Sequence, residues 1–247
     1  MIGAGETKIV VVPCYNEEKR LEPERFLEFR AKGVAVLFVN DGSKDRTAEI
    51  IERFAAANDG IGALQLDRNR GKAEAVRHGL LQALTHGPQL VGYLDADLAT
   101  PPAEMERVLD ALTGSFQVAL GSRVRLMGRD IDRLPMRHYL GRIFATAASW
   151  SLSLPVYDTQ CGAKAFRVTP ALEAALTDRF SSRWAFDVEL IGRLLRPRPG
   201  ITPLEPAQFV EVPLQTWHDV KGSKLSSSAM AGAAIDLMRI ARRQRRS

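Results

Sequence analysis

The first 120 residues alternate between short apolar runs and longer amphipathic stretches, and this alternation constrains the fold more than any other feature. The apolar runs cover residues 8–13, 34–39, 63–66, 90–94 and 118–120. Strands that are apolar on both faces are typical of parallel sheets with helices on both sides. The pattern therefore predicts an α/β fold with a Rossmann-like, mostly parallel sheet flanked by helices.

Helices are predicted between these strands, at residues 17 to about 31, 47–57, 72–84 and 102–112. The last begins at Pro102, and proline is favoured in the first turn of a helix. Beyond Gly121 the alternation loosens, with strands expected at residues 163–166 and 210–214 and helices at 143–154, 170–176, 187–195 and 225–242.

A length of 247 residues fits a single domain of this class. We expect one domain over 1–247, with a nucleotide-binding half at about 8–121, an acceptor-side half at about 122–225 and a basic C-terminal helix or tail at about 225–247.

The net charge of +5 favours an anionic partner, such as a nucleotide, a phospholipid headgroup or a nucleic acid. Five arginines lie in the last nine residues: Arg239, Arg242, Arg243, Arg245 and Arg246. They have no interleaved aromatic residues, so we expect no nucleic-acid partner.

Two cysteines, Cys14 and Cys161, are too few for a disulfide framework and fit a reducing compartment. No apolar run reaches the ~20 residues of a membrane-spanning helix, and the first residues lack the pattern of a signal peptide. The run that comes nearest to this length, 143–154, is uncharged and is expected to be a buried or an interfacial helix. These features predict a cytoplasmic protein.

Three predicted strands end in polar, acidic segments, at residues 15–18, 40–43 and 95–97. The carboxyl ends of parallel strands meet at one edge of the sheet, where open α/β sheets bind ligands. In an extended chain, Asp95 and Asp97 point the same way and can share a divalent cation that clamps a diphosphate. A turn explains an isolated Asp-x-Asp as well, but three acidic strand ends together favour nucleotide binding.

Two common nucleotide motifs are excluded. Gly3 and Gly5 precede the first strand, whereas the dinucleotide fingerprint follows it. Lys72 does not belong to a P-loop, because Leu66 and Ala73 replace the required glycine and hydroxyl residue. Arg68, Arg70 and Lys72 still open a helix and offer diphosphate contacts, with a solvated basic turn as the alternative.

The segments 12–18, 40–45 and 95–97 resemble inverting glycosyltransferases of family 2, which have the GT-A fold. Four further segments resemble dolichyl-phosphate β-glucosyltransferases and related polyprenyl-phosphate sugar synthases. They are Gly-Ser-Arg at 121–123, Asp-Thr-Gln-Cys-Gly-Ala-Lys at 158–164, Arg-Trp-Ala-Phe-Asp-Val-Glu-Leu at 183–190 and Gly-Ser-Lys-Leu at 222–225.

This resemblance implies transfer of a hexose, with glucose from UDP-glucose as the expected donor, to a polyprenyl or dolichyl phosphate. It implies Mg²⁺ or Mn²⁺ on Asp95 and Asp97. The implied nucleotide-sugar contacts are Pro13, Tyr15, Asn16, Glu17, Asp41, Gly42, Lys72, Asp95, Ala96 and Asp97. The choice of hexose, the acceptor chain length, the preferred metal and the oligomeric state stay open.

An acceptor phosphate monoester has a second pKa near ~6 and is mostly dianionic at neutral pH, so it needs cations more than a base. The resemblance implies Arg123, Arg137 and Lys224 as its ligands, and Asp187, Arg123 and Arg137 as catalytic residues. Asp187 is expected to orient the acceptor or a donor hydroxyl; a helix N-terminus is the alternative reason for a carboxylate there.

Departures from the family are Asn40, where aspartate is frequent, and Ala73 with Glu74, where small residues are frequent. The first leaves the nucleoside contact to Asp41, and the second leaves the phosphate contact open.

Eukaryotic relatives carry an N-terminal membrane helix that is not found here. We therefore expect peripheral attachment to the cytoplasmic face of a membrane, through residues 143–154 and the C-terminal arginines. The alternative function is transfer to a sugar hydroxyl, which needs a general base.

Overall fold

We describe a computed structural model of the chain at residues 2–3, 5–132, 135–183 and 185–219. For residues 135–140 only the backbone is described. The predicted helix at 225–242, Lys224 and the C-terminal arginines lie outside the described residues.

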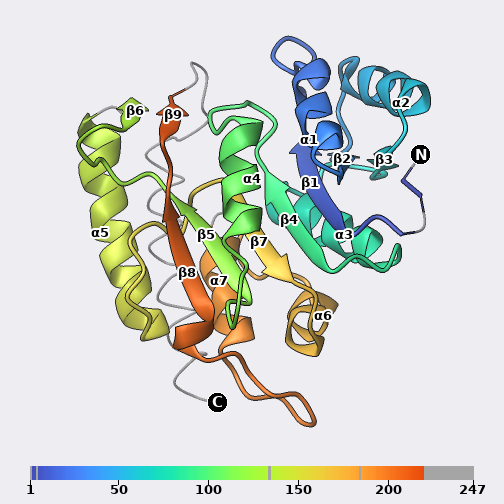
Figure 1. Cartoon of the computed structure of the whole chain (residues 1–247). Helices are drawn as coiled ribbons and strands as arrows, with labels where there is room; N and C mark the ends of the chain where they lie inside the picture. Colours follow the sequence, from blue (N-terminus) through green and yellow to red (C-terminus); the bar gives the residue numbers. More distant parts are fainter. Residues whose placement is uncertain (1, 4, 133–134, 184, 220–247) are drawn as a thin grey trace.

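The centre of the molecule is a seven-stranded sheet in the order β3-β2-β1-β4-β7-β5-β8 (Figure 1). Its strands are β1 Lys8–Cys14, β2 Val34–Asn40, β3 Ile61–Gln65, β4 Leu90–Leu94, β5 Val118–Ser122, β7 Ala163–Arg167 and β8 Phe209–Pro213. All neighbouring strands are parallel except β7, which is antiparallel to both β4 and β5. The predicted α/β fold with a mostly parallel sheet is confirmed.

Helices cover both faces of the sheet because the strands are apolar on both sides. In β1, Ile9 and Val11 pack on one face, whereas Val10 and Val12 pack on the other. The first face carries α3 Lys72–Leu84, α5 Pro135–Leu152, α6 Pro170–Thr177 and α7 Phe186–Leu194. The second carries a 3₁₀ turn at Pro23–Phe26, α1 Leu27–Ala31, α2 Thr47–Ala57 and α4 Pro102–Asp110.

The helix predicted from residue 17 is wrong over most of its length, since only the 3₁₀ turn and the five-residue α1 form there. Pro23 is the physical reason, because a proline disfavours the helical conformation in the residue before it. Glu22 accordingly has φ −108° and ψ 79°. The loop between β1 and this turn is thereby left free to follow the edge of the sheet.

A second, two-stranded sheet was not predicted. It pairs β6 Asp130–Asp132 in parallel with β9 Thr216–His218 and lies near α5 (Figure 1). Helix α5 begins at Pro135, eight residues before the predicted start. Among the residues described, no helix is both long and apolar enough to cross a bilayer.

Candidate functional site

Several loops meet at one edge of the sheet, which we call the rim. Strands β1, β2 and β4 are neighbours and parallel, so the segments that follow them reach this edge together. The Asp41 N–H donates to the Cys14 carbonyl at 2.9 Å. Because β7 is antiparallel, the segment before it also arrives here, and the Asp95 N–H donates to the Gly162 carbonyl at 3.0 Å.

Asp95 and Asp97 lie just beyond β4, beside the first residue of α3. The Lys72 Nζ is 2.5 Å from Asp95 Oδ1, and Asp97 Oδ1 accepts the Ala99 N–H at 3.1 Å. Burial and the negative charge of Asp95 raise the pKa of Asp97. Loss of solvent lowers the pKa of Lys72, but the carboxylates of Asp95 and Asp187 outweigh this and raise it. The rim therefore holds two adjacent carboxylates and one ammonium group.

These groups fit the implied divalent cation. Oxygen donors suit Mg²⁺ and Mn²⁺, and a cation relieves the repulsion that raises the pKa of Asp97. Gly162 supports the fit, since a Cβ there would stand 2.2 Å from Asp95 Oδ2, and only glycine leaves room for that carboxylate. Within the described ranges no cluster of three or more His, Cys, Asp or Glu gathers at one point. Such a cation would take its other ligands from a diphosphate and water, as Mg²⁺ commonly does.

Asp41 fixes the basic loop that precedes α3. Its two carboxylate oxygens accept the N–H groups of Arg70 at 2.7 Å and Gly71 at 2.8 Å. Burial raises the pKa of Asp41, although these two amides act in the opposite direction. Gly42 has φ 61°, and a Cβ there would lie 2.4 Å from the backbone of Arg68. The basic loop is therefore held against the end of β2.

The loops after β1 and β2 are also joined to each other. Asn16, in the left-handed region at φ 53°, donates its N–H to Ser43 Oγ and accepts the Lys44 N–H at 2.8 Å. The Glu17 carboxylate accepts two hydrogen bonds from Arg20, at 2.9 and 2.6 Å. The Glu17 N–H donates to Thr47 Oγ1 at 2.8 Å, so Asn16 and Glu17 both join the two loops, and Pro13 and Tyr15 of the same segment are half-buried.

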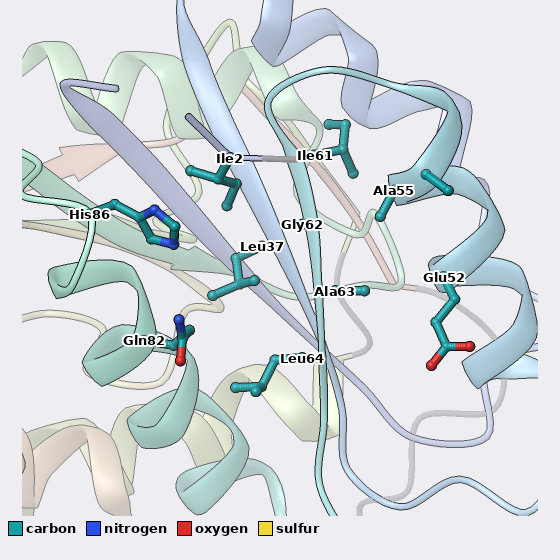
Figure 2. Close-up of a pocket in the computed structure, with 11 residues that line it drawn as sticks. Ile2, Leu37, Glu52, Ala55, Ile61, Gly62, Ala63, Leu64, Gln82 and His86 are labelled. Atoms are coloured by element: carbon teal, nitrogen blue, oxygen red, sulfur yellow. The ribbon is translucent and has the colours of Figure 1, made fainter. Parts of the chain in front are cut away.

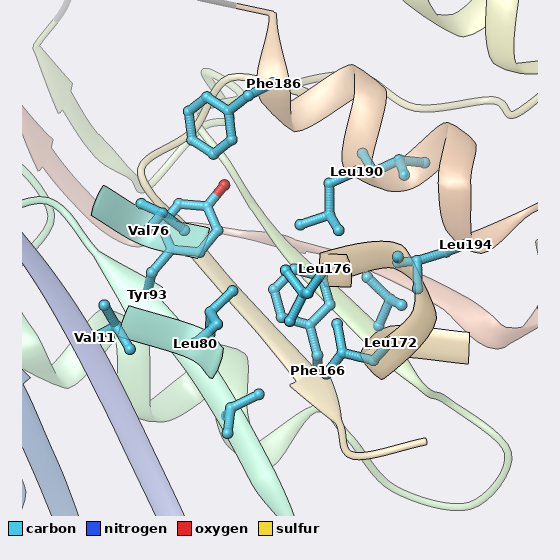
Figure 3. Close-up of a cluster of buried hydrophobic side chains, with 14 of the residues drawn as sticks. Val11, Val76, Leu80, Tyr93, Phe166, Leu172, Leu176, Phe186, Leu190 and Leu194 are labelled. Carbon is cyan, nitrogen blue, oxygen red and sulfur yellow. The ribbon is translucent and has the colours of Figure 1, made fainter. Parts of the chain in front are cut away.

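Asp187 lies in the first turn of α7 and is paired below the rim. Its Oδ1 is 2.8 Å from the Lys164 Nζ and also accepts a hydrogen bond from the Tyr93 hydroxyl. Lys164 is fully buried and donates to the Cys161 carbonyl at 2.5 Å. In Figure 3 the Tyr93 hydroxyl points from β4 toward the start of α7, where Phe186 lies. Burial and the charge of Asp187 raise the pKa of Tyr93 well above its usual value.

Arg123 follows β5 and is engaged by Asp158. Its Nε and Nη2 donate to the two carboxylate oxygens at 2.7 and 2.9 Å, and its N–H donates to Oδ2 at 3.1 Å. Its guanidinium also lies 5.4 Å from the ring centre of Trp217. Burial lowers the pKa of Arg123, but the Asp158 carboxylate outweighs it and raises the pKa. The forked face that we assigned to the acceptor phosphate is thus occupied by Asp158.

The side chains of the two other predicted acceptor ligands, Arg137 and Lys224, are not described. Arg137 lies in the first turn of α5, where only the backbone is described. Lys224 lies outside the described residues, as does Trp184 of the 183–190 segment.

Sequence reasoning gave no role to three residues that the structure brings into the site: Tyr93, Lys164 and Asp158. Lys164 carried a signal, because a lysine within an apolar strand needs a buried partner. Tyr93 carried another, since it lies two residues before Asp95 and so projects from the same side of the strand.

A separate cavity lies along β3, the outermost strand at one side of the sheet, between α2 and α3 (Figure 2). It is lined mainly by apolar side chains such as Ile2, Leu37 and Ile61, with Glu52 and His86 at its margin. It contains none of the predicted site residues, so the rim is the candidate site.

Residues 9–171 match the description "Glycosyl transferase family 2". A dolichyl-phosphate beta-glucosyltransferase of Trichomonas vaginalis is 34 % identical over 94 % of this chain and 69 % of that protein. The protein of the same description from Homo sapiens is 31 % identical over 87 % of this chain and 68 % of that protein.

Two solved structures share the fold. TarS of S. aureus in complex with UDP has a TM-score of 0.53 at 18 % identity, over 96 % of this chain. The mannosyltransferase PcManGT from Pyrobaculum calidifontis, in complex with GDP-Man and Mn²⁺, has a TM-score of 0.50 at 20 % identity, over 83 % of this chain. This chain spans 65 % of the first and 56 % of the second, and at these identities the likeness concerns the fold.

Proposed function

The chain belongs to glycosyl transferase family 2 and has its GT-A fold, and we propose that it transfers glucose from UDP-glucose to a polyprenyl or dolichyl phosphate with inversion. The observation that carries this proposal is the charge arrangement at the rim. Asp95 and Asp97 are adjacent carboxylates that fit a cation, and Lys72 stands 2.5 Å from the first of them. The relatives named for dolichyl phosphate supply the acceptor class.

The proposed reaction is a single displacement. An oxygen of the acceptor phosphate forms a bond to the anomeric carbon, the bond from that carbon to the diphosphate breaks, and UDP leaves with the electron pair. A mostly dianionic phosphate needs no proton removed. A divalent cation held by Asp95 and Asp97 would neutralise the departing diphosphate.

The cationic side chains have separate tasks in this proposal. Lys72, together with Arg68 and Arg70 of the loop before α3, faces the donor diphosphate. Arg123 is held in orientation by Asp158, so it offers the acceptor phosphate its charge and its remaining Nη1. Arg137 and Lys224 complete the acceptor site.

We further propose that the protein works as a peripheral protein on the cytoplasmic face of a membrane, because a polyprenyl phosphate stays in the bilayer. Ile143 and Trp150 of α5 are 69 % and 76 % exposed and lie two turns apart on one side of the helix. Leu126 and Met127, in the loop after β5, are also exposed. Apolar side chains of this size at the surface suit insertion among lipid headgroups.

The second candidate is transfer to a sugar hydroxyl, favoured by the presence of a carboxylate, Asp187, near the rim. A hydroxyl acceptor needs a general base, whereas a phosphate does not. Asp187→Asn should therefore abolish transfer to a hydroxyl but leave measurable transfer to a lipid phosphate.

The proposed function is tested with radiolabelled UDP-glucose, GDP-mannose and UDP-N-acetylglucosamine, each offered with polyprenyl phosphate and with unphosphorylated polyprenol. We expect label in the lipid fraction only for UDP-glucose with the phosphate. Label from another donor would correct the hexose, and equal labelling of polyprenol would support the hydroxyl route.

A further inference from the structure

Asp187 is held by two groups from neighbouring strands. Tyr93 of β4 and Lys164 of β7 are direct cross-strand partners, so their side chains leave the sheet on the same face. Asp187 reaches both of them from α7, and both contact the same oxygen, Oδ1. The carboxylate is therefore fixed from one side by an ammonium and a phenol.

Lys164 needs this carboxylate. A fully buried ammonium is costly unless it is paired and hydrogen-bonded. The Cys161 carbonyl accepts one of its N–H groups, and the Asp187 carboxylate forms an ion pair with it at 2.8 Å. Its Nζ also lies 5.3 Å from the Tyr93 ring centre. Lys164 and Asp187 thus form an ion pair within the core.

The other oxygen of Asp187, Oδ2, has no hydrogen-bond donor within the described part of the chain. Tyr93, which donates to Asp187, lies on β4 two residues before Asp95, so Asp187 lies on the Asp95 side of the rim. The side chain is 8 % exposed, and Oδ2 is the atom left for a ligand.

We propose that Tyr93 and Lys164 are positioning residues for this site. They hold Asp187 as a fixed carboxylate whose Oδ2 accepts a hydrogen bond from a hydroxyl of the donor sugar. This inference rests on the proposed function and adds the role of Asp187 and the two residues that set it.

A double-mutant cycle tests the positioning role. We would measure kcat and KM for UDP-glucose with polyprenyl phosphate in Lys164→Met, Asp187→Asn, the double variant and Tyr93→Phe. If Lys164 acts through Asp187, Lys164→Met and Asp187→Asn should each lower kcat about tenfold or more, and the double variant should be no slower than the slower of these two. Tyr93→Phe should lower kcat about threefold to tenfold and leave the KM for UDP-glucose within about threefold.

The folding of these variants is tested alongside their activity. Lys164→Met leaves a buried carboxylate without its cation, so it is compared with the double variant, which removes both charges, by thermal unfolding. If Lys164→Met does not fold, the kcat values of the double variant and of Tyr93→Phe test the positioning role. The matched control is Lys8→Met with Asp110→Asn, a surface pair at 3.4 Å that should show no coupling in kcat.

The possible outcomes distinguish a failure of the positioning role from a failure of the proposed function. Losses that multiply in the double variant, or an unchanged kcat in Tyr93→Phe, would overturn the positioning role in an active enzyme. Absence of labelled lipid with the wild-type protein would overturn the proposed function, and this inference with it.

Discussion

At the scale of single residues, three carboxylates of the site are each paired with a cation. Asp95 is paired with Lys72, Asp187 with Lys164 and Asp158 with Arg123. Removing one member of a buried pair leaves the other uncompensated, which is strongly destabilising. Variants that change a neutral neighbour are therefore cleaner probes of the site.

Gly162 is such a neighbour. Gly162→Ala would place a methyl group 2.2 Å from Asp95 Oδ2, so the carboxylate must move. Its backbone lies outside the left-handed region, so alanine adds no conformational strain there. We expect metal-stimulated transfer to fall about tenfold or more, while the midpoint of thermal unfolding changes little. Gly3→Ala, where nothing lies within 4 Å, is the control; equal activity in both variants would contradict the placement of Asp95.

The two cysteine thiols should be unreactive in the folded protein. Burial raises the pKa of Cys161 to about 11, and burial with the charge of Glu17 raises that of Cys14 further. Thiolates are the reactive form, so neither thiol should react quickly with a disulfide reagent at pH 7.5. Titration should count no fast thiols in buffer and two in denaturant. A fast thiol in the native protein would show that the end of β1 or the segment before β7 opens.

At the scale of elements, the sequence predicted those features that lie within one segment. Helices α2 and α3 have the predicted bounds because their apolar periodicity is local. The direction of β7 depends on its neighbours and not on its own residues, so its antiparallel pairing was not predictable. That direction brings Gly162 to the rim. In the 17–31 segment the charged composition suggested a helix, and the conformational effect of Pro23 outweighed it.

In the candidate site, too, the sequence predicted the local features but not the contacts between distant residues. The acidic strand ends were readable because carboxylates follow apolar strands, and the structure brings them to one edge. The contacts between Lys164 and Asp187, and between Asp158 and Arg123, join residues far apart in the chain. No local sequence pattern predicts which buried acidic residue pairs with which buried basic residue.

Glu74 connects α3 to the segment that leads to α7. Its carboxylate accepts hydrogen bonds from Arg77 and from the Phe180 N–H at 3.1 Å. Burial raises the pKa of Glu74, but these donors outweigh it and hold the pKa below its usual value. The stabilisation is therefore complete above the unfolded-state pKa and is lost as pH falls through the lower folded-state pKa.

Glu74→Gln should accordingly lower the free energy of unfolding at pH 7 by about 2 kcal/mol, because it leaves the buried guanidinium of Arg77 without its carboxylate. The difference from wild type should shrink as the pH falls below about 4. Denaturant unfolding at a series of pH values measures it, with Glu49→Gln on the exposed side of α2 as the control. A difference that stays constant down to pH 3 would contradict the ionised pair.

At the scale of the whole molecule, the rim and the exposed apolar residues of α5 suggest an enzyme that meets its acceptor at a surface. The C-terminal arginines add charge, and each basic residue near an anionic bilayer contributes on the order of 1 kcal/mol, which salt screens. We expect the protein to co-sediment with anionic vesicles at low ionic strength and to be released at high ionic strength.

Two variants divide the contributions to vesicle binding. Ile143→Gln with Trp150→Gln should weaken binding at any salt concentration, whereas truncation after Ile240 should remove mainly the salt-sensitive part. Full-length protein that stays in the supernatant with anionic vesicles at low salt would contradict peripheral attachment.

The central claim is that Asp95 and Asp97 serve metal-assisted transfer of a hexose to a lipid phosphate. The most direct measurement is labelled lipid formed from UDP-glucose and polyprenyl phosphate, with Mg²⁺ or Mn²⁺ and then with EDTA, for the wild type and for Asp95→Ala. We predict lipid labelling by the wild type with metal, and a loss on the order of 10²-fold or more, several kcal/mol, in EDTA and in the folded variant. Undiminished labelling in EDTA or by Asp95→Ala, or no labelled lipid under any condition, would contradict the account.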